Sequence, residues 1–159
     1  MEQHNSENDW QTAVGMFLLS FGKLEWFTYH LLVLLPTERI FDSVKSLSLS
    51  QRIKLIKDLL ASKNLPEETN NKIVGVLAGA ESLLEFRNTV AHNPLYMGYY
   101  DSEGGLDFRQ QISKFTKLDS AITLEELKTK CTQVAELARS AYSCESEIRR
   151  LELLKKKNA

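Results

Sequence analysis

Three side chains that can take part in phosphate chemistry occur together in Arg-Asn-Thr-Val-Ala-His-Asn-Pro, residues 87–94. They are Arg87, Asn88 and His92. A histidine can remove or donate a proton near neutral pH. An arginine can hold a phosphate and stabilise the charge that develops on it. In RNA the neighbouring 2′-hydroxyl can attack the phosphorus without a metal ion, so these residue types suit cleavage of an RNA phosphodiester.

These residues end a helix that we predict from Pro66 to about His92. Proline is favoured at the first helical position, and Pro94 biases Asn93 away from helical dihedrals. At about 100° per residue, Arg87 falls inside the apolar arc of this helix. That arc is formed by Ile73, Leu77, Ala80, Leu84 and Ala91, and it is widened by Val76, Leu83 and Val90. A polar stripe lies beside it, formed by Glu81, Glu85, Asn88 and His92.

An arginine in an apolar arc needs a partner, because burial of a lone guanidinium is too unfavourable. Glu25 also interrupts an apolar face, so we predict that it pairs with Arg87. Asn88 and His92 lie one turn apart, and the long Arg87 side chain can reach the same spot. Two interpretations stay open at this point. The residues form a site, or Arg87 is a structural ion-pair partner, Asn88 a surface residue and His92 a favourable charge at the helix C-terminus.

Three other segments show the hydrophobic spacing of helices. We predict helices over about 9–35, over 49–62 and from after Thr123 to about Lys155. Ser6 or Asn8 could cap the first of these, and Pro36 stops it. The other two begin at capping boxes, in which paired side chains bond to each other's backbone N–H groups. The pairs are Ser48 with Gln51 and Thr123 with Glu126.

Residues 94–118 have a different character, because aromatic and β-favouring residues flank Asp-Ser-Glu-Gly-Gly. This pattern predicts a short hairpin or an ordered loop. The fold class that we predict is all-α, an antiparallel bundle of four main helices with this hairpin or loop between the third and the fourth. We expect a single domain over 1–159, with about 1–8 and 156–159 frayed.

The composition is that of a soluble globular protein, with 159 residues, 43% hydrophobic and 26% charged. The net charge of −1 neither predicts nor excludes a polyanionic partner. The polar N-terminus is not a signal peptide, and the longest apolar run is too short to span a membrane. Cys131 and Cys144 would lie roughly 20 Å apart on one helix, beyond disulfide reach. We therefore expect a reduced, cytoplasmic protein with no membrane partner.

The segment Phe-Arg-Asn-Thr-Val-Ala-His-Asn-Pro, at the end of the third predicted helix, resembles the signature of the HEPN superfamily (higher eukaryotes and prokaryotes nucleotide-binding). That signature is an arginine, usually with a polar residue next to it, and a histidine after about four to six intervening positions. Here Asn88 follows Arg87, and four residues separate Arg87 from His92. The opening Phe-Gly-Lys-Leu-Glu-Trp-Phe-Thr-Tyr-His-Leu-Leu also resembles first helices of the superfamily. The likeness covers most of the chain in architecture and about six residues in sequence.

The resemblance implies a homodimer in which the arginine–histidine segments of two protomers face each other across a cleft. It implies metal-independent cleavage of RNA that leaves a 2′,3′-cyclic phosphate, with no cofactor. His92 would be the general acid/base, Arg87 would bind the scissile phosphate, and Asn88 would orient the site. Glu25 and Glu85 are the supporting residues that we predict beside these three.

A microbial toxin–antitoxin or defence setting is also implied, with an antitoxin or other regulatory protein as a further partner. Some bacterial toxins of the superfamily have a tyrosine two residues after the histidine, where this chain has Pro94. Other members have lost activity and only bind, so the alternative function is a catalytically silent module for a nucleotide or a protein. A plain helical dimerisation domain is a third interpretation.

The remaining histidines and aromatic residues favour structural roles. We interpret His30 as a satisfied or surface histidine, since scattered histidines do not make a metal site. Tyr96, Tyr99 and Tyr100 could stack on bases. We prefer the interpretation that they pack the hairpin onto the bundle.

Overall fold

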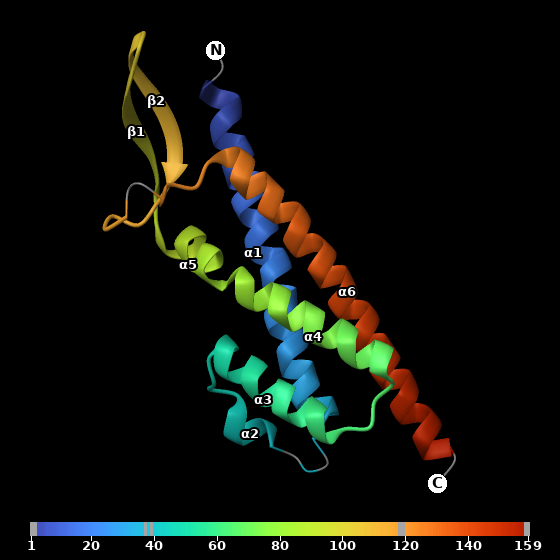
Figure 1. Ribbon diagram of the computed structural model, residues 1–159. Coiled ribbons are helices and arrows are strands. Elements are labelled where there is room, and N and C mark those ends of the chain that lie inside the picture. Colours follow the sequence, from blue (N-terminus) through green and yellow to red (C-terminus); the bar gives the residue numbers. More distant parts are fainter. Residues whose placement is uncertain (1–2, 37, 39, 118–119, 158–159) are drawn as a thin grey trace.

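The computed structural model describes residues 3–36, 38, 40–117 and 120–157. Helices make up most of this part of the chain, and a single hairpin interrupts them (Figure 1). The elements are α1 (Gln3–Leu34), α2 (Phe41–Val44), α3 (Leu49–Ser62), α4 (Glu67–Ser82), α5 (Leu84–His92), β1 (Leu95–Ser102), β2 (Gly105–Ile112) and α6 (Leu124–Lys157). The predicted mostly helical fold with a hairpin before the last helix is confirmed. The short α2 was not predicted.

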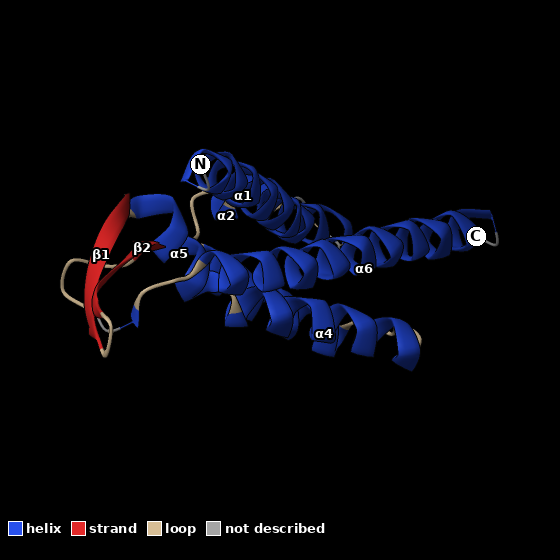
Figure 2. Ribbon diagram, turned by 90° about the horizontal axis from the view of Figure 1, so that it is seen from above, coloured by secondary structure: helices blue, strands red, loops and turns tan. Residues whose placement is uncertain are grey.

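The longest two helices, α1 and α6, pack along each other in the same direction (Figures 1 and 2). Asp9 near the start of α1 pairs with Lys128 near the start of α6, and His30 further along α1 lies against Glu145 further along α6. The expectation of a strictly antiparallel bundle of four helices is therefore wrong for this pair. The reason is that α4 is the element that runs back along α6, and α6 then runs in the opposite direction to α4 and in the same direction as α1.

The helix α4 lies antiparallel to α6. Near one end of the contact, the Thr69 hydroxyl donates to Glu147 at 2.7 Å, and near the other end Gly79 faces Leu137. A Cβ atom at Gly79 would lie 2.6 Å from the Leu137 side chain, so a larger residue there would require the Leu137 side chain to move.

The predicted third helix is divided in two at Leu83. The Ser82 hydroxyl donates to the carbonyl oxygen of Gly79 at 2.8 Å, which is the carbonyl that the Leu83 N–H would meet in a continuous helix. The Leu83 N–H bonds to Glu81 instead, and α5 starts in a new direction (Figure 1). One consequence is that Ala91, which we placed in the apolar arc, is exposed.

The other helix boundaries follow the sequence signals closely. The helix α3 has the predicted bounds, and both hydrogen bonds of the capping box between Ser48 and Gln51 are present. At the start of α6, the Glu126 N–H donates to the Thr123 hydroxyl. The helix α1 begins at Gln3 rather than Asp9, so the predicted caps lie inside it, and the residues of 1–8 and 156–159 that the structure describes are helical.

The hairpin pairs β1 with β2 in antiparallel register, from Leu95 opposite Ile112 to Ser102 opposite Gly105. Gly105 has a φ of 117°, which favours glycine at the turn. Ile112 also exchanges two backbone hydrogen bonds with Ile122, so the base of the hairpin is joined to the segment before α6. The rest of the hairpin projects beyond the helices (Figure 1).

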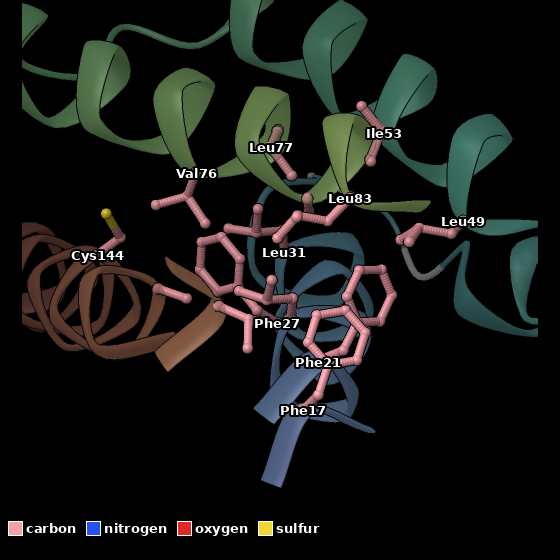
Figure 3. Packing of buried hydrophobic residues seen from close by; sticks show 14 of the residues in the cluster. Phe17, Phe21, Phe27, Leu31, Leu49, Ile53, Val76, Leu77, Leu83 and Cys144 are labelled. Atoms are coloured by element: carbon pink, nitrogen blue, oxygen red, sulfur yellow. The ribbon is translucent and has the colours of Figure 1, made fainter. Parts of the chain in front are cut away.

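One hydrophobic core joins the helices. Aromatic residues of α1 fill its middle, and aliphatic residues of α3 and α4 cover them (Figure 3). The labelled members are Phe17, Phe21, Phe27, Leu31, Leu49, Ile53, Val76, Leu77, Leu83 and Cys144. Across the described part of the chain, no helix has both the length and the apolar character needed to cross a membrane.

Candidate functional site

The three predicted catalytic residues lie on α5, the short helix between the bundle and the hairpin. The Arg87 side chain is 28% exposed, whereas Asn88 and His92 are exposed to solvent. The helix is held to α1 from one side, because Val90 is buried and Phe86 packs edge-on against Phe17 at 5.2 Å. The opposite side of α5 is thus available to a ligand or to another chain.

Arg87 pairs with Glu25, as predicted. Its Nη2 atom lies 3.1 Å from a Glu25 carboxylate oxygen, and its guanidinium lies 5.8 Å from the centre of the Phe21 ring. Its Nη1 atom donates to the Asn88 side-chain oxygen at 3.1 Å. The guanidinium therefore bends from the apolar arc toward the stripe that carries Asn88 and His92. Since a guanidinium has five N–H groups, these two contacts leave donors for an anion.

Glu25 is itself fixed to the core through its backbone. The Thr28 hydroxyl donates to the Glu25 carbonyl oxygen at 2.7 Å and accepts a hydrogen bond from Arg52 at 2.9 Å. Arg52 is only 5% exposed. The sequence interpretation missed this second arginine, although it lies on the apolar stripe of its own helix, three positions after Leu49 and four before Ile56.

His92 is the last residue of α5, and Asn93 ends the helix in an extended conformation. The Asn93 amide donates to the Thr89 carbonyl oxygen at 2.8 Å, so Asn93, which we had not considered for this role, satisfies a carbonyl at the helix end. Within residues 3–36, 38, 40–117 and 120–157, no side chain forms a hydrogen bond or ion pair with His92. Its ring is thus free to exchange a proton with a ligand.

The two glutamates of the predicted polar stripe face other partners. Glu81 pairs with Lys57 of α3 at 3.0 Å, and Glu85 pairs with Lys114 at 3.0 Å. The hydrogen bond from Lys114 lowers the pKa of Glu85 below its usual value. Glu85 therefore connects α5 to the segment after the hairpin, and it does not contact Arg87 or His92.

The tyrosines of the hairpin do not pack it onto the bundle, so our preferred interpretation of them is wrong. Tyr99 is 69% exposed and meets Phe108 edge-on at 5.2 Å, within the hairpin itself. Tyr96 bonds to Ser113 at 2.8 Å, also within the hairpin and its base. The hairpin is too far from the core, beyond its base, for these rings to be buried there.

His30 and the two cysteines have structural surroundings. The Nδ1 atom of His30 lies 2.8 Å from a Glu145 oxygen, in a contact whose direction is not that of a hydrogen bond. Cys131 and Cys144 are both free thiols, and burial raises the pKa of each. Among the residues that the structure describes, no three His, Cys, Asp or Glu side chains are grouped to hold a metal ion.

Comparison with known proteins gave no match to a family model, to a curated protein or to a solved structure.

Proposed function

We propose that the protein is a metal-independent endoribonuclease of the HEPN type, with a composite site formed by two copies of the chain. The observation that carries this proposal is the end of α5, where Arg87 bonds to Asn88 and the His92 ring lies exposed one turn further on. The resemblance to the superfamily signature adds a setting, a microbial toxin–antitoxin or defence system with an antitoxin or other regulatory protein.

The reaction needs one base, one acid and one cation. His92 of one copy takes the proton of the 2′-hydroxyl while that oxygen forms a bond to phosphorus. The bond from phosphorus to the 5′-oxygen breaks, and the protonated His92 returns its proton, through a water molecule, to that oxygen. Arg87 holds the phosphate and stabilises its developing negative charge. The products are a 2′,3′-cyclic phosphate and a 5′-hydroxyl end.

The spacing of the residues favours a shared site over a site within one copy. Arg87 and His92 are five residues apart on α5, so their Cβ directions differ by about 140°. Glu25 and Asn88 hold the guanidinium between these directions. A second copy that places its own α5 opposite could bring a His92 ring to each Arg87.

The test is a cleavage assay with single-stranded RNA in the presence of EDTA, with analysis of the new ends. We expect cleavage and cyclic phosphate ends, and no loss of activity on chelation. A matched control is Arg149→Ala, since Arg149 is also an arginine paired with a glutamate but lies on α6, away from α5. Cleavage that needs a metal ion, or ends without cyclic phosphate, would contradict the proposal.

Mixing two inactive variants tests the composite site. Arg87→Ala and His92→Ala should each be inactive alone. A heterodimer of the two retains Arg87 from one chain and His92 from the other, so the mixture should recover a fraction of the wild-type activity. No recovery after the chains have exchanged, as shown by mass spectrometry of the intact dimer, would place both residues in a site within one copy.

The alternative function, a silent binding module, is favoured by the ion pair itself. Glu25 neutralises part of the Arg87 charge, as a purely structural contact would. In that case the wild-type protein would cleave no RNA, and Arg87→Ala would lose stability rather than activity.

A further inference from the structure

The hairpin carries large aromatic side chains that nothing in the described chain covers. Phe115, in the segment after β2, is 89% exposed, and Tyr99 and Phe108 are 69% and 55% exposed. Each of these rings keeps apolar surface in water, which is unfavourable by roughly 25 cal/mol per Å². Several such rings on one small projection mark a surface that meets a partner.

One face of the hairpin is hollowed into a groove of about 850 Å³. In the antiparallel register, Tyr96 lies opposite Gln111 and Gly98 lies opposite Arg109. Tyr100 is two residues further along β1, opposite Asp107. Directly opposed residues of a strand pair share a face, so these side chains line the same side. Phe115 forms a wall of the groove from the segment after β2.

The floor of this groove is a fixed polar network. Gln111, which is buried, donates to the Tyr96 hydroxyl at 2.7 Å and accepts from the Tyr100 hydroxyl. Gly98 makes room for it, because a Cβ atom there would lie 2.6 Å from the Gln111 amide nitrogen. The amide keeps a second N–H and a second lone pair beyond these two bonds. Because Gln111 is only 5% exposed, it serves to hold the hydroxyl groups of Tyr96 and Tyr100 in place.

The groove has little net charge. Among the described residues that line it there is no aspartate or glutamate, and the one charged side chain is Arg109. Its guanidinium lies 5.5 Å from the centre of the Tyr100 ring. Asp107, outside the lining, pairs with it at 2.6 Å and reduces its charge. Flat rings and hydrogen-bonding groups, rather than net charge, therefore dominate the surface.

The position of the groove connects it to α5. Pro94, two residues after His92, is one of its lining residues. A strand of RNA that places a phosphate at Arg87 could continue along the hairpin without leaving the surface. A groove at the far end of the bundle would offer no such continuity.

We infer that the hairpin groove binds an unpaired base of single-stranded RNA, with the exposed ring of Phe115 as its stacking surface. Proteins that bind single strands use exposed aromatic rings in this way, because every base has a face for stacking. A base paired in a duplex is already stacked and is excluded from the groove. The inference rests on the proposed function, since it names the form of the RNA that the α5 site would receive.

The test measures binding of a labelled single-stranded RNA of about ten nucleotides to the His92→Ala protein, by fluorescence anisotropy. Phe115→Ala in the same background should weaken binding roughly tenfold, and Phe115→Trp should restore it. The control is Tyr142→Ala, which removes a ring that is 75% exposed on α6, outside the groove, and should change the affinity less than twofold. The matching duplex RNA should bind much more weakly than the single strand.

The results separate this inference from the nuclease proposal. Equal binding by Phe115→Ala and the parent protein, equal losses in Phe115→Ala and Tyr142→Ala, or no binding of single-stranded RNA would each overturn the inference. If the wild-type protein cleaves RNA and Phe115→Ala cleaves it with the same kcat/KM, the inference fails and the nuclease proposal stands. If the RNA binds through Phe115 but the wild-type protein cuts nothing, the nuclease proposal fails alone.

Discussion

Two arginines contact α1 one turn apart, and their surroundings are opposite. Arg52 is buried and its guanidinium meets three neutral oxygens, those of Thr28, Tyr29 and Leu47, at 2.7–2.9 Å. It also lies 4.0 Å from the centre of the Tyr29 ring. Arg87 is partly exposed and meets one carboxylate and one amide oxygen. Arg52 thus holds elements together, whereas Arg87 keeps part of its guanidinium open to solvent.

The difference shows why sequence position alone does not identify an arginine that a ligand can reach. Both lie in the apolar arc of their helices, and both have their partners on α1. Arg52 has no remaining access to a ligand. Arg87 has access because α5 is short and ends at the surface. Thr28 connects the surroundings of the two arginines. Its hydroxyl accepts a hydrogen bond from Arg52 and donates one to the backbone carbonyl oxygen of Glu25.

The largest effect that we predict is a loss of RNA cleavage on substitution of His92, on the same helix as Arg87. His92→Ala should reduce RNA cleavage by about 10² to 10⁴-fold, because it removes a general acid and base. The stability should not change, since the ring is exposed. Cleavage rates and urea unfolding of the same samples test both expectations. A large fall in stability would make His92 a structural residue.

The second largest effect that we predict is a loss of stability on substitution of Arg52. Arg52→Met should lower the free energy of unfolding by about 3 kcal/mol, because it leaves buried acceptors without donors. The activity per folded molecule should be retained. Urea unfolding measures the change in stability, and an activity assay at low temperature measures the activity per folded molecule. Arg149→Met, at an exposed ion pair on α6, is the control and should change stability by less than about 1 kcal/mol.

A smaller effect is expected for the ion pair of Arg87. Glu25→Gln should change the free energy of unfolding by about 1 kcal/mol or less, because both side chains are nearly 30% exposed and water screens the pair. The change should shrink as salt is added. A double-mutant cycle with Arg87→Gln measures the coupling. A coupling as large as the loss in Arg52→Met would remove the contrast between the two arginines.

The smallest effect concerns pH and a third charged cluster, at Glu145. Burial alone would raise the pKa of Glu145, but the neighbouring His30 and Arg149 outweigh it and hold the pKa below its usual 4.5. A carboxylate with a lowered pKa stabilises the fold above its unfolded pKa, and this contribution is lost as the pH falls through the folded value. Glu145→Gln should therefore reduce the loss of stability below about pH 4.5 by a few tenths of a kcal/mol. Thermal unfolding from pH 3 to pH 7 measures it, and an unchanged profile would contradict the assignment.

The parts of the fold that depend on local signals could be predicted. The capping box at Ser48 and the hydrophobic spacing after it fixed the bounds of α3. The pairing of Glu25 with Arg87 followed from two charges that each interrupt an apolar face. The break at Leu83 could not be found in this way, because no proline lies between residues 67 and 92 to mark it.

The candidate site was predictable in its residue types but not in its surroundings. Nothing in the spacing of the hairpin tyrosines indicates whether their rings face the core or the solvent. Arg52 was missed, although the argument that we applied to Arg87 holds for it equally. The direction of α6 could not be predicted either. It depends on whether α3 runs across the bundle or along it, and the sequence does not indicate this.

The parallel pair of α1 and α6 has a consequence for synthesis on the ribosome. The first long helix to emerge has its largest packing surface with the last one, so the core cannot close while the chain is still growing. Glu25 is synthesised early, but its partner Arg87 is supplied only when α5 has been made. The position of α1 is fixed only when α6 packs against it. A nascent chain of this protein therefore cannot complete its core before α6 has left the ribosome, and the proposed nuclease site would form only then.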